Sequence, residues 1–565
     1  MLRALTGHAF GVATGVVADV ASAGRSVGRS VANPVVVLGR AGILQPYSPL
    51  TLARLGLTLS RWGTGLAGGY ASLAVRFPDR TALVDESGEL TVAELHARTN
   101  ALAHQLRERG VREGDLVAVL CRNHRGFVEA TVAVAKLGAD VIFLNTAFAG
   151  PQLVEILDRE SPVALIHDDE FATAVGEAAV SLRLIAWSEG AAEGTETLEQ
   201  LIATGSRGDL TPPGRTGRIV VLTSGTTGAP KGAPRSEAGI AGAVSILGAL
   251  PLRQGGRTYV AAPLFHTWGL AHLALATLLG STVVLRRRFE PEELLRTIEE
   301  ERCDAVAVVP VMLQRVLQLP AEVLDHYRLD TLRVVASSGS ALAGDLATEW
   351  MDRFGDTLYS TYGSTEVAHA AVAGPADLRA CPGTAGRPPY AVTVRILDDD
   401  GVEVATGETG RIFVGNGLLF EGYTGGGSKE VLDGLMATGD VGRLDAAGRL
   451  FVEGRDDEMI VSGGENVFPQ EVEDCLARHP AVREAAAVGV EDAEFGARLR
   501  AFVVPLDTSG RIEEDELKAW VRDHLARYKV PREIVFLEEL PRNATGKVLK
   551  RDLVEAKRSR QRGKS

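Results

Sequence analysis

The stretch that decides the fold runs from Val220 to Gly232 and reads V-V-L-T-S-G-T-T-G-A-P-K-G. The apolar residues 219–222 predict a short buried strand, which leads into a loop of Gly, Ser and Thr ending in Pro230-Lys231-Gly232. Glycines let a backbone approach a ligand closely, and successive N–H groups in such a turn form a concavity that suits an anion. The loop therefore predicts a polyphosphate site, with a Ser/Thr-rich surface turn as the alternative. It is not a Walker A loop, because Lys231 is followed by Gly232 and not by Ser or Thr.

Composition narrows the class of protein. A chain of 565 residues is long enough for roughly three or four domain-sized units. The net charge of −13 argues against a general nucleic-acid binder, which would carry basic patches. The four cysteines lie far apart in the sequence, so they predict a reduced compartment and neither a zinc site nor a disulfide framework.

The first 69 residues differ from the rest of the chain. They hold six arginines and a single acidic residue, Asp19, among many small apolar residues. Two interpretations stay open: an arm that touches a membrane surface, and a poorly ordered extension with one or two helices. No apolar run is long enough to span a membrane, and no cleavage site follows an apolar core. We therefore expect a cytoplasmic protein, with membrane association as the alternative.

The order of predicted elements indicates an α/β fold. A capping box at Thr91–Glu94 begins a helix that ends at Gly110, and the apolar strand 116–120 follows. This alternation repeats, which predicts parallel-rich sheets covered by helices on both faces. Short strands with turns around residues 392–414 predict a small antiparallel, barrel-like section.

The predicted domains are an N-terminal extension, a large domain and a small one. The compact part is expected to begin near Tyr70, and a charged break falls near Gly454–Asp457. Beyond the break, the pattern predicts a smaller α+β unit that ends in a basic tail. The boundaries are therefore 1–69, 70–456 and 457–565, with the last domain expected to be mobile.

Two polar turns carry candidate chemistry in the large domain. Tyr362–Glu366 follows a predicted strand, and open α/β sheets bind ligands at such strand ends. Beside a triphosphate, Glu366 would suit Mg²⁺, which prefers oxygen ligands; the alternative is a solvated polar turn. Thr438-Gly439-Asp440 presents a carboxylate that suits the hydroxyls of a ribose, and an Asx turn is the alternative.

Two further stretches lie at the domain break and near the C-terminus. The charged run Gly454–Glu458 is compatible with a hinge or with an ordinary interdomain turn. Pro541–Lys547 places a lysine on a glycine turn, where it could reach an anionic centre or remain a surface lysine.

Taken in this order, the stretches resemble the successive motifs of the adenylate-forming superfamily, which includes acyl-CoA synthetases, adenylation domains of peptide synthetases and beetle luciferase. The resemblance covers about residues 70–550, and the chain looks most like bacterial fatty-acid–CoA ligases (long-chain acyl-CoA synthetases). It implies that a fatty acid is activated with ATP and Mg²⁺ to an acyl-adenylate, which coenzyme A converts to acyl-CoA with release of AMP. A fatty acyl-AMP ligase that loads a carrier protein, and a non-catalytic acyl or nucleotide sensor, are the alternatives.

The resemblance also implies roles for individual residues. Lys547, Thr365 and Glu366 would be catalytic, and Glu366 would hold the metal. Asp457 would be the hinge, and Ser462, Gly463 and Gly464 would line the coenzyme A tunnel. ATP would be bound by Thr223, Ser224, Gly225, Thr226, Thr227, Gly228, Lys231, Ser338, Gly339, Ser340, Tyr362, Gly363, Ser364, Asp440 and Arg455.

The acyl pocket is expected around Pro263–Gly269, where His266 and Trp268 would form its wall; core packing is the alternative for Trp268. Peptide-synthetase domains carry an Asp at the place of His266, so an amino-acid substrate is disfavoured. Small residues after Glu366 are expected to leave room for a long chain, and they are Ala368, Ala370, Ala371 and Ala373. Chain length and oligomeric state stay open.

Overall fold

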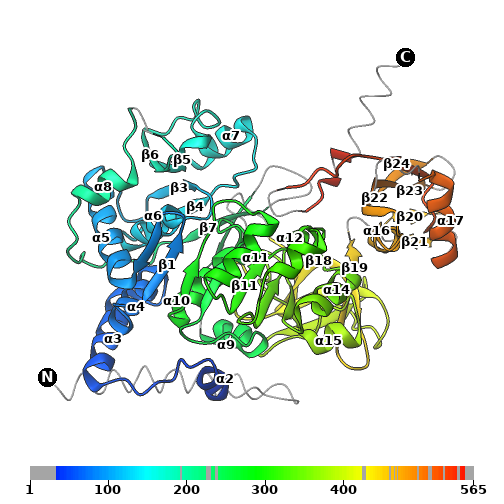
Figure 1. Ribbon diagram of the computed structural model, residues 1–565, viewed down its shortest axis with the longest axis horizontal. Coiled ribbons are helices and arrows are strands. Elements are labelled where there is room, and N and C mark those ends of the chain that lie inside the picture. The colour runs from blue at the N-terminus through cyan, green and yellow to red at the C-terminus, as the bar shows by residue number, and fades with distance from the viewer. Residues whose placement is uncertain are drawn as a thin grey trace.

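A computed structural model describes most of the chain, apart from its two ends and several loops. It covers residues 34–190, 194–223, 231–235, 240–420, 422, 428–456, 460–462, 465–467, 469–492, 496–506, 512–525, 529–543, 547–550 and 552–553, with only the backbone described at 223, 231–235, 240–241, 461–462, 465–466, 491–492 and 496–497. Figure 1 shows a large part that runs to about residue 456 and a smaller C-terminal part beside it. This two-part α/β arrangement confirms the predicted fold class.

The larger of the two main sheets has eight strands, of which the inner ones are parallel. Its order is β14-β13-β12-β11-β9-β10-β1-β2, with β13 to β1 parallel and the two edge strands antiparallel. The apolar strands are buried between layers of helices, as expected for parallel strands. The strands are β1 (Thr81–Asp85), β2 (Gly88–Thr91), β9 (Arg257–Val260), β10 (Thr282–Val284), β11 (Ala305–Val308), β12 (Val334–Ser337), β13 (Leu358–Tyr362) and β14 (Ala371–Ala373).

Helices cover this sheet on both faces. On one face pack α11 (Pro291–Glu300), α12 (Pro310–Leu317) and α14 (Gly344–Phe354), and the buried Trp350 is the largest side chain in that layer. On the other face lie α9 (Ile240–Ala249) and α10 (Thr267–Leu279). Two short helices, α13 (Ala321–His326) and α15 (Pro375–Ala380), complete this part of the large domain.

The second main sheet has six strands in the order β6-β5-β3-β4-β7-β8 and is parallel except at β8. Helices α5 (Val92–Glu108), α6 (Arg125–Lys136) and α8 (Leu198–Thr204) pack on one face, and α7 (Gly150–Glu160) packs on the other. The strands are β3 (Leu116–Leu120), β4 (Asp140–Phe143), β5 (Ala164–Asp168), β6 (Leu182–Trp187), β7 (Ile219–Thr223) and β8 (Lys231–Arg235).

The predicted capping box at the start of α5 is present. The Glu94 N–H donates to Thr91 Oγ1 at 3.1 Å, and the Thr91 N–H donates to Glu94 Oε2 at 2.8 Å. Strand β8 was not expected, because it contains Pro234, which lacks a ladder donor. Proline is tolerated there because β8 is the edge strand of its sheet.

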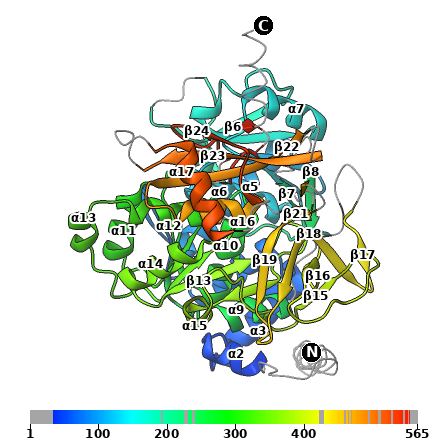
Figure 2. The same ribbon diagram turned by 90° about the vertical axis from the view of Figure 1, so that its right-hand side faces the viewer.

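Two smaller sheets complete the fold. The predicted antiparallel section is β15 (Thr393–Leu397), β16 (Gly410–Gly415), β17 (Val431–Leu432), β18 (Leu435–Leu444) and β19 (Leu450–Arg455). The C-terminal part combines α16 (Pro469–Ala477) and α17 (Glu514–His524) with β20 (Ile460–Ser462), β21 (Glu465–Val467), β22 (Val482–Asp492), β23 (Gly496–Pro505) and β24 (Glu533–Phe536). Figure 2 shows this C-terminal part, in orange, in front of the large domain, with the yellow antiparallel sheet to one side.

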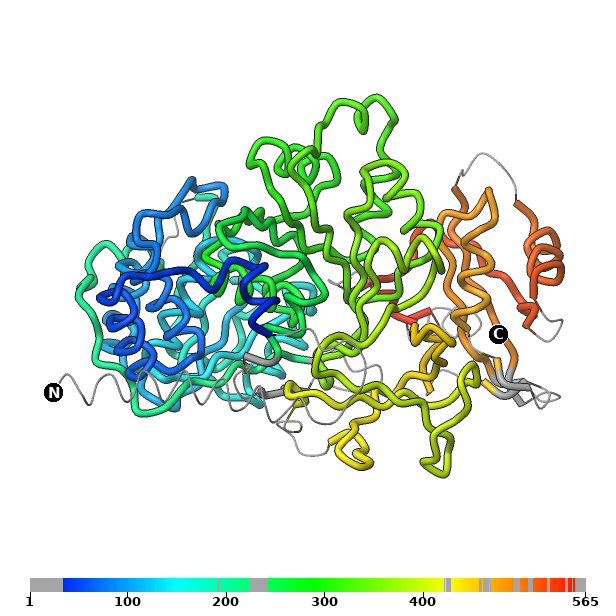
Figure 3. Tube along the Cα trace, turned by 90° about the horizontal axis from the view of Figure 1, so that it is seen from below, coloured from blue at the N-terminus to red at the C-terminus, as the bar shows by residue number. Residues whose placement is uncertain are grey.

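The N-terminal region contains helices ahead of Tyr70, where the compact part was expected to begin, and that boundary stays a prediction. Tyr70 lies inside α4 (Leu66–Arg76), and α4 follows α2 (Pro34–Arg40) and α3 (Pro49–Trp62). Val37 of α2 is buried against α9. Figure 3 shows this blue segment running along the large domain. Residues 34–69, called the N-terminal arm below, are therefore packed on the domain that was expected to begin after them.

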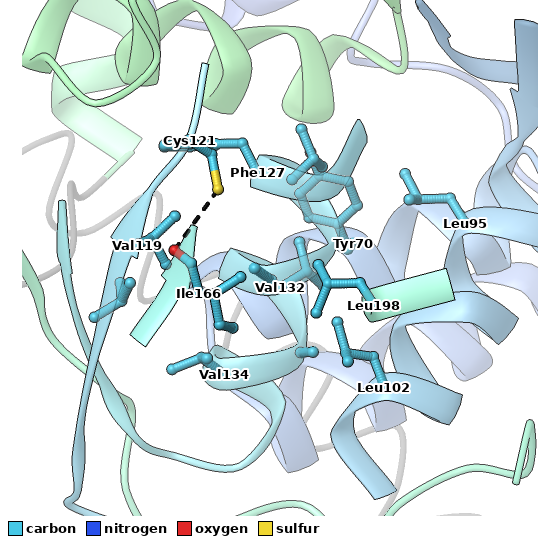
Figure 4. Close-up of a cluster of buried hydrophobic side chains, with 14 of the residues drawn as sticks. Tyr70, Leu95, Leu102, Val119, Cys121, Phe127, Val132, Val134, Ile166 and Leu198 are labelled. Atoms are coloured by element: carbon cyan, nitrogen blue, oxygen red, sulfur yellow. Dashed lines mark hydrogen bonds between the residues drawn. The ribbon is translucent and has the colours of Figure 1, made fainter. Parts of the chain in front are cut away.

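A dense apolar core surrounds α6. Figure 4 shows Phe127, Val132 and Val134 packed with residues of α4, α5 and the neighbouring strands. Cys121 belongs to this core, its Sγ lies 3.8 Å from the Ile166 carbonyl, and burial raises the pKa of its thiol well above the ordinary value. No helix in the described part of the chain is long and apolar enough to cross a membrane.

One lysine is buried between α5 and α6. The Lys136 side chain is almost inaccessible, and its Nζ donates to Asn100 Oδ1 at 2.6 Å and to Thr99 Oγ1 at 2.8 Å. Burial lowers the pKa of Lys136 to about 7, and the nearby charge of Asp209 only partly opposes this effect. An unfolded lysine has a pKa near 10.4, so the unfolded chain binds more protons between these values, and the stability that depends on Lys136 rises with pH there.

We expect the Lys136→Met variant to lack this pH dependence. Between pH 7 and about 10, the free energy of unfolding of the wild type relative to the variant should rise by about 1.4 kcal/mol per pH unit. Denaturant unfolding at several pH values measures this difference. The matched control is Lys518→Met, because Lys518 pairs with Glu514 at 2.7 Å and lies in the other domain. Parallel stability curves for the wild type and Lys136→Met would contradict the assignment.

Candidate active site

A single large cleft collects the carboxyl ends of the parallel strands. The cleft has a volume of about 2620 Å³ and is lined by residues of both domains. Segments that follow β9, β11, β12 and β13 line it, and so do Asn145 and Phe148, which follow β4. Open α/β sheets bind ligands at this edge, so the topology alone directs a ligand into the cleft.

The predicted turns after β12 and β13 both lie in this cleft. Ser338, Gly339 and Ser340 line it, and Ser338 Oγ donates to the Thr361 carbonyl at 2.8 Å, which joins the two turns. Gly363 permits a close approach, because a Cβ there would lie 2.1 Å from the Ala368 carbonyl oxygen. Only glycine fits at this place in the Tyr362–Glu366 turn.

Thr365 and Glu366 line the same cleft. The backbone of Glu366 is held on both sides: its N–H donates to Ser364 Oγ at 3.2 Å, and its carbonyl accepts from the Phe420 N–H at 2.8 Å. A hydroxyl beside a carboxylate on a fixed backbone is a set of oxygen donors that suits Mg²⁺.

Asp440 and Arg455 are paired across β18 and β19. They occupy facing positions of the ladder, and Arg455 Nη1 lies 3.5 Å from Asp440 Oδ1. The Tyr362 hydroxyl donates to Asp440 Oδ2 at 2.5 Å, which connects this ladder to the end of β13. Burial raises the pKa of Asp440, while the Tyr362 hydroxyl and the charges of Arg455, Lys547 and Lys429 act in the opposite direction.

Lys547 lies in the same cleft and belongs to the small domain. It closes a short turn in which the Asn543 N–H donates to the Lys547 carbonyl and the Lys547 N–H donates to Asn543 Oδ1, both at 2.9 Å. A bridge between Arg542 and Val548 extends this hairpin. Lys547 lines the cleft, and its charge lowers the pKa of Asp440. Two predicted site residues that lie more than one hundred positions apart in the sequence therefore line the same cleft.

Several predicted residues lie wholly or partly outside the described part. The backbones of Thr223 and Lys231 pair with each other in β7 and β8, so the phosphate-type loop leaves and re-enters the sheet at one point. The residues between them, Ser224, Gly225, Thr226, Thr227 and Gly228 among them, are outside the description, as are Asp457, Gly463, Gly464 and the side chain of Ser462.

The predicted acyl segment lies at the start of α10. Trp268 both lines the cleft and packs on the core, with its Nε1 donating to the Val308 carbonyl at 3.1 Å, and its role in an acyl pocket stays a prediction. His266 also lines the cleft, and burial lowers the pKa of His266 to about 4. Among the described residues, no hydrogen-bond partner faces the buried His266 Nε2. The predicted acyl segment therefore presents a neutral imidazole and an indole to the cleft at neutral pH.

The small residues after Glu366 do not all serve the pocket. Ala368 lines the cleft, but Ala370, Ala371 and Ala373 are fully buried in the core. The expectation that all four leave room for a substrate is wrong, because the chain enters β14 and alternates into the core. Ala368 has a φ of +60°, a left-handed conformation that is rare for alanine.

Sequence reasoning missed the residues that hold this segment. Asn416 Nδ2 donates to the carbonyls of Val367 and His369 at 2.8 and 3.0 Å, on either side of Ala368. His369 Nε2 lies 2.8 Å from Ser245 Oγ on α9, which ties the segment to the acyl side of the cleft. No motif marks Asn416, since its role depends on a contact between distant strands. Lys429, which also lines the cleft, was missed for the same reason.

Comparison with known proteins places this site in a family. Residues 71–424 match the family described as AMP-binding enzyme, and residues 471–547 match the AMP-binding enzyme C-terminal domain. A feruloyl-CoA synthase of Amycolatopsis sp. is 37% identical over 84% of this chain and 95% of its own length. An indoleacetate–CoA ligase of Aromatoleum aromaticum is 35% identical over 88% of this chain and 98% of its own length.

Solved structures agree with this match. The anthranilate CoA ligase AuaEII in complex with anthranoyl-AMP superposes with a TM-score of 0.78 and 26% identity, over 87% of this chain and 96% of that one. The o-succinylbenzoate CoA synthetase of Bacillus subtilis, with its acyl-adenylate intermediate, gives a TM-score of 0.75 and 29% identity, over 86% of this chain and 97% of that one. The predicted resemblance is confirmed for the superfamily, but these relatives do not support the narrower one to fatty-acid–CoA ligases.

We expect Asn416→Ala to destabilise the large domain by about 1–3 kcal/mol, because it removes the side-chain donor to two buried backbone carbonyls. Thermal and denaturant unfolding measure the loss. Asn416→Asp separates the causes, since it keeps an acceptor for the Leu418 N–H, which lies 2.7 Å from Asn416 Oδ1, but removes both donors. The aspartate variant should lose at least as much stability; a wild-type value for it would show that the donors do not hold the segment.

Proposed function

Because the chain belongs to the AMP-binding enzyme family, we propose that it is an AMP-forming acid–CoA ligase for aromatic carboxylic acids. In the first step, a carboxylate oxygen attacks the α-phosphorus of ATP, and the bond to the β-phosphate oxygen breaks, releasing pyrophosphate. In the second step, the coenzyme A thiolate attacks the acyl carbon and AMP leaves. The observation that carries this proposal is the meeting of Asp440, Arg455 and Lys547 in one cleft with Glu366.

The nucleotide would lie between the two turns and the β18–β19 ladder. Ser338–Ser340 and Tyr362 would flank the adenine, and Asp440 with Arg455 would hold the ribose. The Tyr362 hydroxyl already fixes one oxygen of Asp440, so the carboxylate is oriented before a ligand arrives. The loop between β7 and β8 would hold the β- and γ-phosphates through its backbone N–H groups and Lys231.

Thr365 and Glu366 would act at the α-phosphate. Glu366 would hold Mg²⁺, which when bound would neutralise charge on the phosphates. Negative charge gathers on the phosphorus during attack, and a cation already in place stabilises it. Lys547 would supply that cation, because its charge reaches Asp440 in the same cleft.

Lys547 belongs to the small domain, so the charge could be withdrawn after adenylation. Polar contacts seen between the domains are weak: Gln314 Nε2 donates to the Arg483 carbonyl at 3.2 Å, and the exposed Arg478 and Asp345 lie 3.9 Å apart. Rotation about Asp457 would remove Lys547 and bring the segment Ser462–Gly464 to the acyl side, where it would line the path of coenzyme A.

The substrate class is inferred from the relatives and from the acyl end of the cleft. The relatives named above carry the names of feruloyl, indoleacetate, anthranilate and o-succinylbenzoate ligases. Around His266 and Trp268, the cleft is lined by uncharged residues of α9 and α10, namely Ala243, Ile246, Leu270, Ala271 and Ala274. A flat apolar ring with a single carboxylate matches this neutral, aromatic wall.

A fatty acid is the second candidate, and one observation favours it. The lining of the cleft also includes Leu55, Leu59 and Trp62 of α3, which are apolar side chains that suit a long chain. A carrier-protein acceptor is less favoured than coenzyme A, because the relatives are named as CoA ligases. A non-catalytic sensor would not require Lys547, Glu366 and Asp440 to remain together.

A panel of acids tests the substrate class. Pyrophosphate release is expected to be fastest with aryl and arylalkenyl acids such as ferulate or indoleacetate, and thioester should form only when coenzyme A is added. We expect kcat/KM for these acids to exceed that for fatty acids of eight to sixteen carbons at least tenfold, about 1.4 kcal/mol in transition-state binding. A higher kcat/KM for fatty acids than for aromatic acids would replace the aromatic proposal with the fatty-acid candidate. The absence of pyrophosphate release with every acid would overturn both.

The Lys547→Ala variant tests whether the small domain supplies Lys547 for adenylation only. Adenylation should slow about 10²–10³-fold, because one preorganised charge on the transition state is lost. Thioester formation from preformed acyl-adenylate should be nearly unchanged, since Lys547 would have left the site. Lys518→Ala is the control, because Lys518 lies on α17 and bonds to the Arg532 carbonyl at 2.8 Å. Equal loss of both steps would contradict the rotating-domain account.

A further inference from the structure

The N-terminal arm carries an unusual amount of exposed apolar surface. Thirteen large hydrophobic side chains are exposed in the described part of the chain, and seven of them lie between residues 35 and 59. Leu50 is 61% exposed, and Leu52 and Leu57 are each 53% exposed. A gathering of such side chains marks an interaction surface. We call these seven residues the apolar face of the arm; they are Val35, Val36, Leu44, Leu50, Leu52, Leu57 and Leu59.

Helix α3 supplies four of the seven residues of this face. Its own sequence supports its first turn. Ser48 caps it, with the Thr51 N–H donating to Ser48 Oγ at 3.1 Å, and Pro49 occupies its first turn. None of its residues is buried. Leu55 and Trp62 are half-buried, whereas Leu50, Leu52, Leu57 and Leu59 are exposed. The leucines are therefore displayed and not used for folding.

The positive charge of the arm indicates which kind of surface it would bind. Arg40, Arg54 and Arg61 are exposed, and residues 34–78 contain no Asp or Glu. The whole chain has a net charge of −13, so this is a basic island on an acidic protein. Leucines with interleaved arginines on one surface helix are the pattern of a helix that lies in the interface of an anionic membrane.

We propose that α3 and the adjoining arm dock the enzyme on the surface of an anionic lipid bilayer. Helix α3 has 14 residues, too few to span a bilayer, so it would lie flat with its leucines in the headgroup region. A second copy of this chain is a poorer occupant, because pairing two α3 helices would set Arg54 and Arg61 against the same charges.

The position of α3 gives the contact a consequence for the cleft. Leu55, Leu59 and Trp62 of α3 line part of the cleft, together with Ile43 and Tyr47 of the arm. Docking would therefore place this part of the cleft at the lipid–water interface, where an apolar acid accumulates. This consequence depends on the proposed acid-ligase function, but the docking itself does not.

Vesicle co-sedimentation of the full chain tests the docking. We expect binding to phosphatidylcholine vesicles that contain phosphatidylglycerol, weaker binding to phosphatidylcholine alone, and release by salt. Leu50→Ser/Leu57→Ser and Arg54→Gln/Arg61→Gln should each raise the lipid concentration for half-binding at least tenfold, since one basic residue contributes about fivefold. The matched control is Val402→Ser/Val431→Ser, because Val402 and Val431 are 61% and 50% exposed elsewhere.

Three outcomes decide the proposal. Loss of binding in both arm variants, with melting temperatures and control binding at wild-type values, supports it. Binding that is equal for all variants, or equal for neutral and anionic vesicles, overturns it. Concentration-dependent dimers in light scattering that disappear in Leu50→Ser/Leu57→Ser, without vesicle binding by the wild type, would identify a second copy as the occupant and also overturn it. Because the vesicle readout needs no turnover, its failure is distinct from a failure of the ligase proposal.

Discussion

The carboxylate of Asp440, whose side chain is 14% exposed, makes the interactions on which the arrangement of the site depends. A buried charge is costly unless it is paired and hydrogen-bonded, and this one draws its partners from three separate parts of the fold. Tyr362 ends a strand of the eight-stranded sheet, Arg455 belongs to the antiparallel sheet, and the charge of Lys547 comes from the small domain. A single carboxylate therefore couples the positions of three units, because moving any of them leaves the charge less compensated.

The parallel sheets supply the rest of the site by topology. Four neighbouring strands end at the same edge, so residues far apart in sequence meet in the cleft without a dedicated contact. Side-chain geometry then refines the meeting, as where Ser338 bonds to the Thr361 carbonyl and Asn416 holds the segment around Ala368. The sheet brings the loops together. A few polar side chains that hydrogen-bond to the loop backbone, such as Ser338 and Asn416, then fix the orientation of the loops.

The success of sequence reasoning followed from how local each signal was. Three predicted features depend on residues that are close in the chain, and the structure contains all of them: the capping box at Thr91, the parallel strands and the Tyr362–Glu366 turn. Strand β8 and the packing of α2 depend on distant partners, and both were missed. The order of the motifs predicted the family, while Asn416 and Lys429 could not be found, because nothing in their local sequence indicates a cleft. The phosphate-type loop between Thr223 and Lys231 stays a prediction.

The character of the acyl end shows why a substrate class is harder to predict than a fold. On an exposed loop, His266 would titrate near pH 6.5, but here burial lowers the pKa of His266 to about 4. His266 also stands at the N-terminus of α10, where the helix dipole disfavours a positive charge. Burial, which depends on tertiary packing, keeps the imidazole neutral at pH 7, and its neighbours on α9 and α10 that line the cleft are uncharged. Neither the burial of His266 nor the uncharged side chains of α9 and α10 in the cleft is evident from the local sequence, so the substrate class stays a proposal while the fold does not.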